Sequence, residues 1–232
     1  MNMDKKRALS ELSVKTRSIW LLSYGDLITL LITFFIMMIS LRAGQISRIH
    51  KWVEGRIDEA MSELQNVANE LNLNEINISR NSKGIRIALN DPRLFETGSA
   101  EPRTNLIYQL DALSSGIKSL EIFHLEKSKY ASLINNLNAD GYAWNVEIRI
   151  EGHTDNIPLT NSQTYKDNWE LSAARAQTVM RLLQESTKLP ERQFAVAGFG
   201  EFQPIDVNNT GKGRENNRRV EVYISASIIE AQ

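Results

Sequence analysis

Two places in the sequence carry side chains that could bind an ion or a charged ligand. The first is Asp26, the single charged residue in the apolar run from 20 to 41. Because desolvation raises the proton affinity of a carboxylate, a carboxylate at this position could alternately bind and release a cation. The second is a cluster that combines Asp155 with Arg175, Arg218 and Arg219. An acid beside bases suits a ligand that carries both an ammonium and a carboxylate, as a zwitterionic amino acid does.

Both places also have a purely structural interpretation. Asp26 could lie near the membrane interface and set the depth of its helix, while neighbouring hydroxyls bond to carbonyls of their own helix. Asp155 could cap a turn, and the three arginines could be solvated or ion-paired.

His153, Thr154 and Asp155 do not predict an enzyme. No serine or cysteine nucleophile accompanies them in a matching arrangement, and one histidine with one aspartate does not make a metal site. We therefore expect no catalytic residue, no metal and no cofactor apart from a transported ion.

The composition excludes further classes of function. With 27 Lys and Arg against 28 Asp and Glu, the net charge of −1 offers no basic field for nucleic acid. The chain has no cysteine, which excludes disulfide scaffolds, cysteine-ligated zinc and a cysteine nucleophile. Its 232 residues are enough for one or two domains.

The apolar run predicts a membrane span. As a helix, the 22 residues from Trp20 to Leu41 would be about 33 Å long, enough to cross a bilayer, whereas the apolar part of a cleaved signal peptide is shorter. Residues 1–19 are rich in Lys and Arg, so we expect them to form a cytoplasmic tail and the chain after the span to lie across the membrane, which in the inner membrane of a Gram-negative bacterium is the periplasm.

Polar residues share one face of this predicted helix. Asp26, Thr29 and Thr33 recur at spacings of three and four, so they lie on one stripe. A single helix cannot enclose such a stripe. We therefore expect further helices around it, from a second copy, from a multi-span partner, or from both.

Residues 42–78 are predicted to form a helical connector, because apolar residues recur there at spacings of three and four. These are Ile46, Ile49, Val53, Ile57, Met61, Leu64, Val67 and Leu71. The stripe would be buried either in a homodimeric coiled coil or against the chain's own domain, and the sequence leaves both open.

Residues 79–232 are predicted to form a domain in which strands alternate with helices. Alternating patterns predict strands at 85–89, 146–150, 194–199 and 219–225, and helical patterns cover 104–120 and 168–183. This order favours an α/β layer with helices packed on one sheet. Between them, residues 120–144 are expected to add a helix and a loop.

The N-terminal run, WLLSYGDLITLLITFF, resembles the membrane segment of the B subunits of ion-driven stator units, of the MotB, PomB and ZorB types. The aspartate of that pattern falls on Asp26. The resemblance implies an ion relay at Asp26, with Thr29 and Thr33 beside it. The connector is short compared with flagellar relatives, which favours the ZorB type of Zorya anti-phage systems over flagellar MotB.

The C-terminal part carries a second resemblance. IEGHTDN, NWELSAARA, GFGEFQP and NRRVEVYI reproduce in order the signature of OmpA-like peptidoglycan-binding domains, and LFETGSAE matches an earlier element. This implies an α+β sandwich of order βαβαββ that holds the diaminopimelate of the stem peptide. Carried over by motif, Asp155 would bind the ammonium and Arg175 the carboxylate, with Thr154, Asn168, Leu171 and Arg219 lining the site.

Together, the resemblances imply a B subunit of a rotary stator, anchored to peptidoglycan and conducting an ion. The expected ion is a proton, with sodium as the other candidate, and the expected assembly is a dimer inside a pentamer of a multi-span A-type subunit. The alternative is a passive tether between inner membrane and peptidoglycan, which would leave Asp26 without a role.

Overall fold

The computed structural model describes residues 3–71, 73, 76–91, 93–159 and 164–231, and the side chains of 4–19 and 42–47 lie outside the described part. The chain divides into two compact units, residues 1–52 and 53–232. Helix α1 (Met3–Glu70) supplies all of the described structure of the first unit and the beginning of the second.

The first unit contains the expected apolar helix. Trp20–Leu41 has a mean hydropathy of 2.0, and none of this segment is buried within the chain. Leu27, Phe34 and Met37 are among its exposed apolar side chains. An exposed apolar surface of this length is suited to contact with lipid or with other protein chains.

The second unit is built on a five-stranded sheet of order β1-β2-β5-β3-β4. The strands are β1 (Ile76–Asn81), β2 (Gly84–Leu89), β3 (Tyr142–His153), β4 (Phe194–Gly198) and β5 (Arg219–Glu230). Only the β3 and β4 pairing is parallel. The helices are α2 (Thr104–Ser119), α3 (Ala131–Ala139), α4 (Asn168–Thr187) and α5 (Gly211–Asn217).

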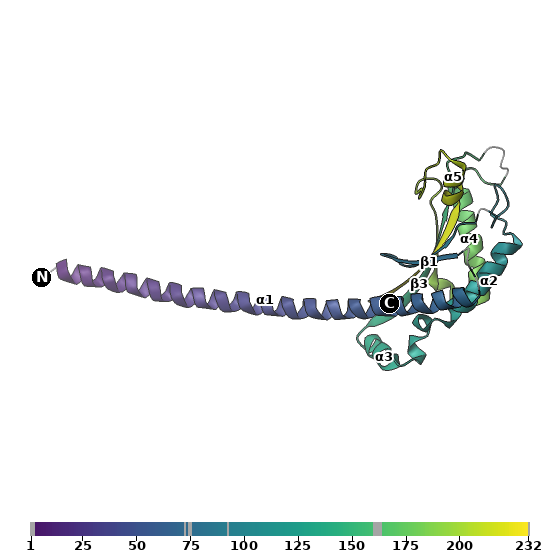
Figure 1. Cartoon of the computed structure of the whole chain (residues 1–232). Helices are drawn as coiled ribbons and strands as arrows, with labels where there is room; N and C mark the ends of the chain where they lie inside the picture. Colours follow the sequence, from purple (N-terminus) through teal and green to yellow (C-terminus); the bar gives the residue numbers. More distant parts are fainter. Residues whose placement is uncertain (1–2, 72, 74–75, 92, 160–163, 232) are drawn as a thin grey trace. The chain divides into compact units, whose positions relative to one another are not determined.

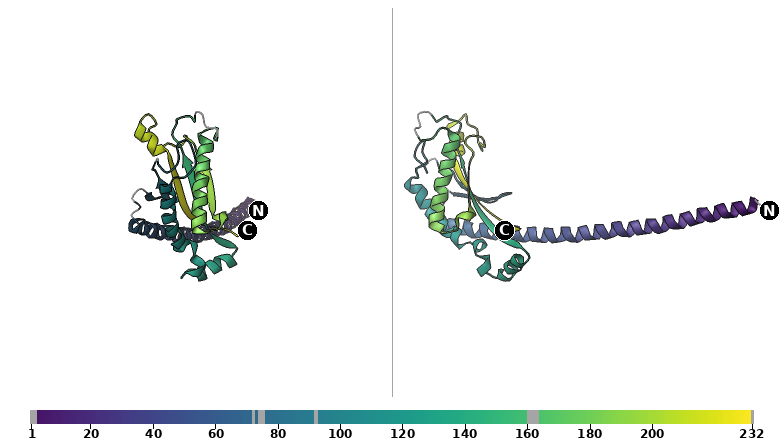
Figure 2. Two further views of the ribbon diagram at one scale, coloured as in Figure 1. Left: turned by 90° about the vertical axis from the view of Figure 1, so that its right-hand side faces the viewer. Right: turned by 180° about the vertical axis from the view of Figure 1, so that it is seen from behind.

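Helices α2 and α4 lie on one side of this sheet (Figures 1 and 2). The core lies between them and the sheet, because alternate residues of β2, β3 and β5 turn apolar side chains to the helix side. These buried residues include Ile85, Ile87, Ile148, Ile150, Val222 and Ile224 from the strands, with Leu106, Leu110, Leu113, Ala176, Val179 and Leu183 from the helices. The predicted class, an apolar helix followed by a mixed α/β domain, is confirmed.

Strand β1 was not expected from the sequence. The order βαβαββ is provided by β2, α2, β3, α4, β4 and β5, and β1 adds an antiparallel edge strand beside β2. The helical part of the predicted connector ends at Glu70, and the sheet begins at Ile76 rather than after 78. The turn between β1 and β2 uses Gly84 with φ +126°, a conformation that a side chain would strain.

The last part of α1 packs on its own domain. Val53, Ile57 and Leu64 are buried, and a Cβ atom placed on Gly116 of α2 would lie 2.9 Å from Val67 Cγ1. Arg80 of β1 forms ion pairs with Glu54 and Asp58 of α1. Between Val53 and Leu64 the apolar stripe is therefore largely covered within the chain, whereas Leu71 remains 44% exposed, so this part of the stripe favours packing on the chain's own domain.

Residues 120–144 form two short 3-10 helices, Glu121–Phe123 and Leu125–Lys127, then α3 and the first residues of β3. The Trp144 indole N–H donates to the Ile122 carbonyl at 2.9 Å and ties this segment to the sheet. A third 3-10 helix, Glu191–Gln193, precedes β4. Helices α3 and α5 lie near opposite ends of the sheet (Figure 1).

Candidate functional site

A cavity of about 700 Å³ lies where β3 ends and α4 begins. All six residues expected to bind peptidoglycan line it: Thr154, Asp155, Asn168, Leu171, Arg175 and Arg219. The segment 94–98, which the sequence singled out through LFETGSAE, also contributes to the wall. The structure thus gathers the six predicted residues, from three separate motifs, and part of a fourth motif at one place.

Close packing of β3 and α4 positions these residues. Gly152 lies against the backbone of α4, where a Cβ atom would come within 2.0 Å of the Ser172 carbonyl oxygen. Asp167 caps the N-terminus of helix α4, and its carboxylate accepts from the Glu170 N–H at 2.9 Å. Asn168, Leu171 and Arg175 line the cavity at positions i, i+3 and i+7 of this helix, so they share one face.

Asp155 is buried, with 6% of its surface exposed, and its carboxylate is already engaged. Oδ2 accepts from Arg218 Nη1 at 2.7 Å, and Oδ1 accepts from the Ile157 N–H at 3.1 Å. Both the turn geometry and the ion pair that the structural alternative proposed are therefore present. A ligand ammonium would have to share this carboxylate with Arg218 or displace it.

Arg175 offers a cation to the cavity. Its Nε donates to the Ser99 carbonyl at 2.9 Å, and its guanidinium lies 5.1 Å from the centre of the Phe95 ring. Burial lowers the pKa of Arg175 to about 10, and the neighbouring Arg218 cation acts in the same direction. Among the described residues, no carboxylate lies within ion-pair distance of Arg175. A buried guanidinium that lacks a paired carboxylate among the described residues favours binding of an anionic ligand group.

Thr154 and Asn168 supply further polar groups. The Thr154 hydroxyl is buried and has no hydrogen-bond partner within the described part of the chain. The Asn168 side-chain amide donates to the carbonyls of Asp155 and Ile157 at 3.2 and 3.1 Å, so it fixes the loop that carries the acid. Leu171 is buried beneath them and gives the cavity an apolar floor.

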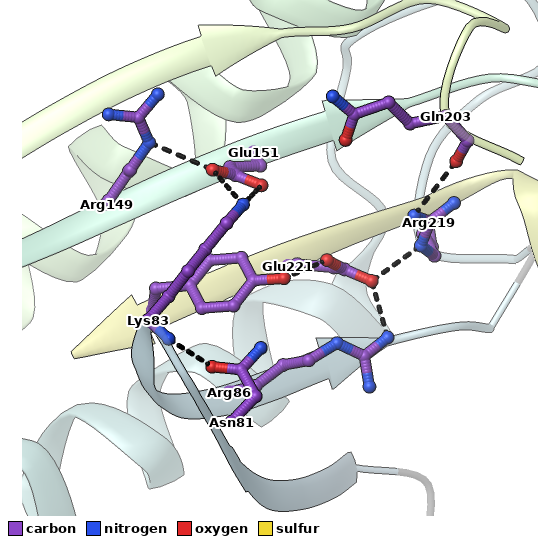
Figure 3. A network of polar contacts seen from close by, with 9 residues as sticks. Asn81, Lys83, Arg86, Arg149, Glu151, Gln203, Arg219 and Glu221 are labelled. Atoms are coloured by element: carbon purple, nitrogen blue, oxygen red, sulfur yellow. Dashed lines mark hydrogen bonds and ion pairs between the residues drawn. The ribbon is translucent and has the colours of Figure 1, made fainter. Parts of the chain in front are cut away.

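Arg219 lines the cavity but is bonded elsewhere. Its Nε donates to Glu221 Oε1 at 2.6 Å, and Nη2 donates to the Gln203 carbonyl at 3.2 Å. Figure 3 shows this side chain as one end of a polar network that crosses three strands. Arg218, which the sequence grouped with Asp155 but which the family resemblance did not include among the binding residues, is the arginine that contacts Asp155.

The network lies on the sheet face away from α4. Residues 149, 151 and 153 of β3 alternate with Gly152, which faces α4, and they pair with Tyr223, Glu221 and Arg219 of β5. Lys83 and Arg149 both donate to Glu151, while Arg86, Arg219 and the Tyr223 hydroxyl donate to Glu221 (Figure 3).

These contacts determine what the acidic residues can bind. Possible ligand atoms of Glu151, His153 and Glu221 lie within 4.8 Å of one another, as in a metal site. However, four cationic side chains already compensate the two carboxylates, so a divalent cation would meet net positive charge. The cluster therefore fits a structural role that joins β2, β5 and β3.

His153 is buried beside this network, with its ring stacked on Phe199 at a centroid distance of 5.3 Å. Both ring nitrogens lack a hydrogen-bond partner among the described residues. Burial lowers the pKa of His153 to about 4, and the Arg219 cation contributes to the decrease. The imidazole is thus neutral at pH 7.

The expected ion-relay residues lie on α1 in the first unit. Asp26 and Thr29 border one shallow surface together with Ser23 and Gly25. The Thr29 hydroxyl donates to the Asp26 carbonyl at 2.8 Å, and the Thr33 hydroxyl donates to the Leu30 carbonyl at 2.9 Å. The two threonines therefore satisfy their donors within the helix, as the structural alternative proposed, and both hydroxyl oxygens keep acceptor capacity.

Comparison with known families finds matches to two separate parts of the chain. Residues 4–53 match the family described as membrane MotB of the proton-channel complex MotA/MotB, and residues 124–218 match the OmpA family. Motility protein B of Bacillus subtilis is 34% identical over 143 residues, which are 62% of this chain and 46% of that relative. The protein YtxE of B. subtilis is 24% identical over 247 residues, covering 92% of this chain and 90% of its own length.

Solved structures agree on the fold. A MotB-like protein from Desulfovibrio vulgaris covers 76% of this chain and 98% of its own, with 21% identity and a TM-score of 0.57. The cell wall anchor of the T6SS from Pseudomonas aeruginosa covers 72% of this chain and 94% of its own, with 25% identity and a TM-score of 0.50. The chain thus combines a MotB-type membrane segment with an OmpA-like domain, the organisation of MotB-type stator B subunits.

Proposed function

We propose that this chain is the peptidoglycan-anchored B subunit of an ion-driven rotary stator unit in the bacterial inner membrane. The N-terminus would be cytoplasmic, and the OmpA-like domain would lie in the periplasm, where it holds the stem peptide. An anchored domain and an intramembrane acid on one chain make mechanical sense, because ion flux can produce torque only if the generator is held still.

The observation that carries the anchoring part is the placement of Arg175 and Asp155 in one cavity. In this proposal, Arg175 binds the carboxylate of diaminopimelate, since its guanidinium has carbonyl partners and no paired anion among the described residues. Asp155 binds the ammonium, and the Thr154 hydroxyl, buried without a partner in the described structure, donates to or accepts from the ligand. Arg218 shares the charge of Asp155.

The observation that supports ion transport is Asp26 on an apolar helix surface. Asp26 would relay a proton, or sodium as the second candidate, within a dimer surrounded by a pentamer of a multi-span A-type subunit. Thr29 and Thr33 would offer hydroxyl oxygens along the same face. Protonation of Asp26 would change its contacts with the surrounding helices and so bias one rotation step.

The biological output has two candidates. The short connector favours anti-phage defence of the Zorya type, whereas the relatives named motility protein B favour flagellar rotation. A passive tether is the remaining alternative, supported by the threonine hydroxyls that bond within their own helix.

Binding of purified peptidoglycan sacculi tests the anchor. The full-length chain in detergent should sediment with sacculi, and Asp155→Asn and Arg175→Ala should each lower the affinity more than tenfold. Arg181→Ala is the matched control, because Arg181 lies exposed on the same helix. Equal retention of all four proteins would refute the assignment of this cavity.

Asp26→Asn tests the relay, because it removes the titratable charge and keeps the size. In a host carrying the whole operon, we expect wild type to protect against phage or to support swimming, and the variant to lose that activity at unchanged membrane levels. Activity that survives the substitution would favour the passive tether. The assay that responds, plating or swimming, decides between defence and motility.

A further inference from the structure

Two exposed aromatic rings stack on each other next to the proposed peptide site. Trp169 at the start of α4 keeps 47% of its surface exposed, and Phe202 in the loop after β4 keeps 63%. Their ring centroids lie 5.2 Å apart with an interplanar angle of 28°. Large aromatic side chains left in solvent as a pair are more often a binding surface than part of a core.

The backbone beneath this pair is held in place. The Gly200 N–H donates to the hydroxyl of Ser172, which is fully buried, at 3.0 Å, and the Gly200 carbonyl accepts from the Thr154 N–H at 2.9 Å. On the other side of Phe202, the Gln203 carbonyl accepts from Arg219 at 3.2 Å. The rings therefore lie on an ordered loop. A ligand that binds them causes little further loss of conformational entropy in this loop.

One side chain joins the aromatic pair to the peptide cavity. The Asn168 amide donates to the carbonyl of Asp155 at 3.2 Å and to Glu201 Oε2 at 3.3 Å. Trp169 follows Asn168 in the chain and Phe202 follows Glu201, and neighbouring Cα atoms are about 3.8 Å apart. The loop that carries Asp155 and the loop that carries Phe202 are thus joined through one side chain that lines the cavity.

The chemistry of the pair suits a sugar. A hexopyranose has a face of C–H groups that packs on an aromatic ring, while its hydroxyl and acetamido groups project outward to polar side chains. Glu201, which precedes Phe202 in the same loop, carries a carboxylate that can accept hydrogen bonds from such groups. In the polymer that carries the stem peptide, an N-acetylated sugar is attached directly to that peptide.

We propose that Trp169 and Phe202 form a platform that binds an N-acetylated sugar of the glycan strand while the cavity holds the attached stem peptide. This inference rests on the proposed peptidoglycan function and extends it from the peptide to the sugar. The site would then recognise both the sugar and the peptide that is attached to it. Free peptides would therefore bind more weakly than peptides still joined to glycan.

Calorimetry with two ligands tests the platform on the full-length chain in detergent. The ligands are a diaminopimelate-containing stem tetrapeptide and the same tetrapeptide attached to its N-acetylated disaccharide. We expect wild type to bind the disaccharide-peptide at least fivefold more tightly than the free peptide. Trp169→Ala and Phe202→Ala should each bring this ratio close to one and leave the affinity for the free peptide unchanged. Tyr108→Ala is the control, since Tyr108 is 68% exposed on α2, and it should keep the wild-type ratio.

Equal binding of both ligands by wild type would overturn the platform and leave the peptide site standing. Unchanged ratios in both variants would also overturn it and would assign the rings to another partner, such as a protein. Equal loss of both ligands in the variants would mean that the rings support the peptide cavity, which again overturns the sugar assignment. If wild type binds neither ligand nor sacculi, the proposed function itself fails.

Discussion

Arg218 Nη1 lies 2.7 Å from Asp155 Oδ2, so the acid expected to hold a ligand ammonium already has a cationic partner within the chain. The Asp155 side chain is 8% exposed and the Arg218 side chain 32%. The more accessible member of the pair is thus the one that a ligand could move. A ligand ammonium would replace one cation by another at a carboxylate that remains charge-compensated, which keeps the cost of desolvation low.

Replacement of Arg218 separates its structural role from binding. Arg218→Gln leaves Asp155 without its cation, so we expect the free energy of unfolding of the domain to fall by about 1–3 kcal/mol. Binding of sacculi should persist, because the ligand ammonium can then compensate Asp155. Thermal unfolding with and without the stem tetrapeptide measures both effects. Loss of binding as complete as in Asp155→Asn would show that Arg218 itself contacts the ligand.

His153 should make the folded domain sensitive to mild acid. Burial lowers its pKa to about 4, against an ordinary value of 6.5, so the folded state binds this proton more weakly than the unfolded state. The stability that the neutral imidazole provides is therefore complete above pH 6.5 and is lost as the pH falls toward 4. The shift corresponds to about 3 kcal/mol. The carboxylate of Glu221, whose pKa is lowered to about 2 although burial opposes the change, loses its contribution only at lower pH.

Denaturant unfolding between pH 7 and 5 measures this dependence in wild type and in His153→Phe, which keeps an aromatic ring against Phe199. The slope of stability against pH should be smaller in the variant. His50 and His124 are present in both proteins, so they cancel in the difference. Parallel pH profiles would show that His153 is not responsible.

Those strands and helices of the domain that the sequence predicted each had a periodicity of their own. IRIAL and VEIRI alternate and became β2 and the middle of β3, and NWELSAARA opens α4 as expected. The short β1 was missed because INISRN has only two apolar positions, and its edge pairing with β2 is a tertiary feature. A sequence pattern likewise defines the apolar stripe of α1 and does not specify its partner.

The sequence motifs predicted that Asp155 and Arg175 would lie together, and both line one cavity, but the motifs did not predict the different contacts of the two adjacent arginines. Arg218 and Arg219 precede and begin β5, and consecutive side chains at a strand point in opposite directions. Arg219 pairs in register with His153 on the face that carries Glu221, whereas Arg218 reaches Asp155. Sheet register sets that choice, and a single sequence contains no separate signal for it.

A methyl group at Gly152 should separate the two halves of the site. Its Cβ would lie 2.0 Å from the Ser172 carbonyl oxygen, a backbone atom of α4 that cannot rotate away. We expect Gly152→Ala to destabilise the domain by about 1–3 kcal/mol and to weaken binding of sacculi, since Asp155 follows β3 and Arg175 lies on α4. Thermal unfolding and co-sedimentation measure these effects.

Gly55→Ala is the matched control, because nothing lies within 4 Å of a Cβ atom there and Gly55 is inside helix α1. Alanine favours a helix, so this variant should be at least as stable as wild type. Wild-type stability in Gly152→Ala would mean that β3 and α4 can move apart without cost.

Leu64 tests whether the stripe of α1 stabilises its own domain or a dimer. Leu64 is fully buried within the chain, and its Cδ1 lies 3.3 Å from the Cβ position of Gly116, so Leu64→Ala should cost about 2–5 kcal/mol of domain stability. Leu71→Ala is the control on the same sequence stripe, because Leu71 is 44% exposed and should change stability little. Since the contacts of Leu64 lie within one chain, the midpoint of thermal unfolding should shift equally at low and high protein concentration. A shift that grows on dilution, together with an effect of Leu71→Ala as large as that of Leu64→Ala, would mean that the stripe pairs with a second copy instead.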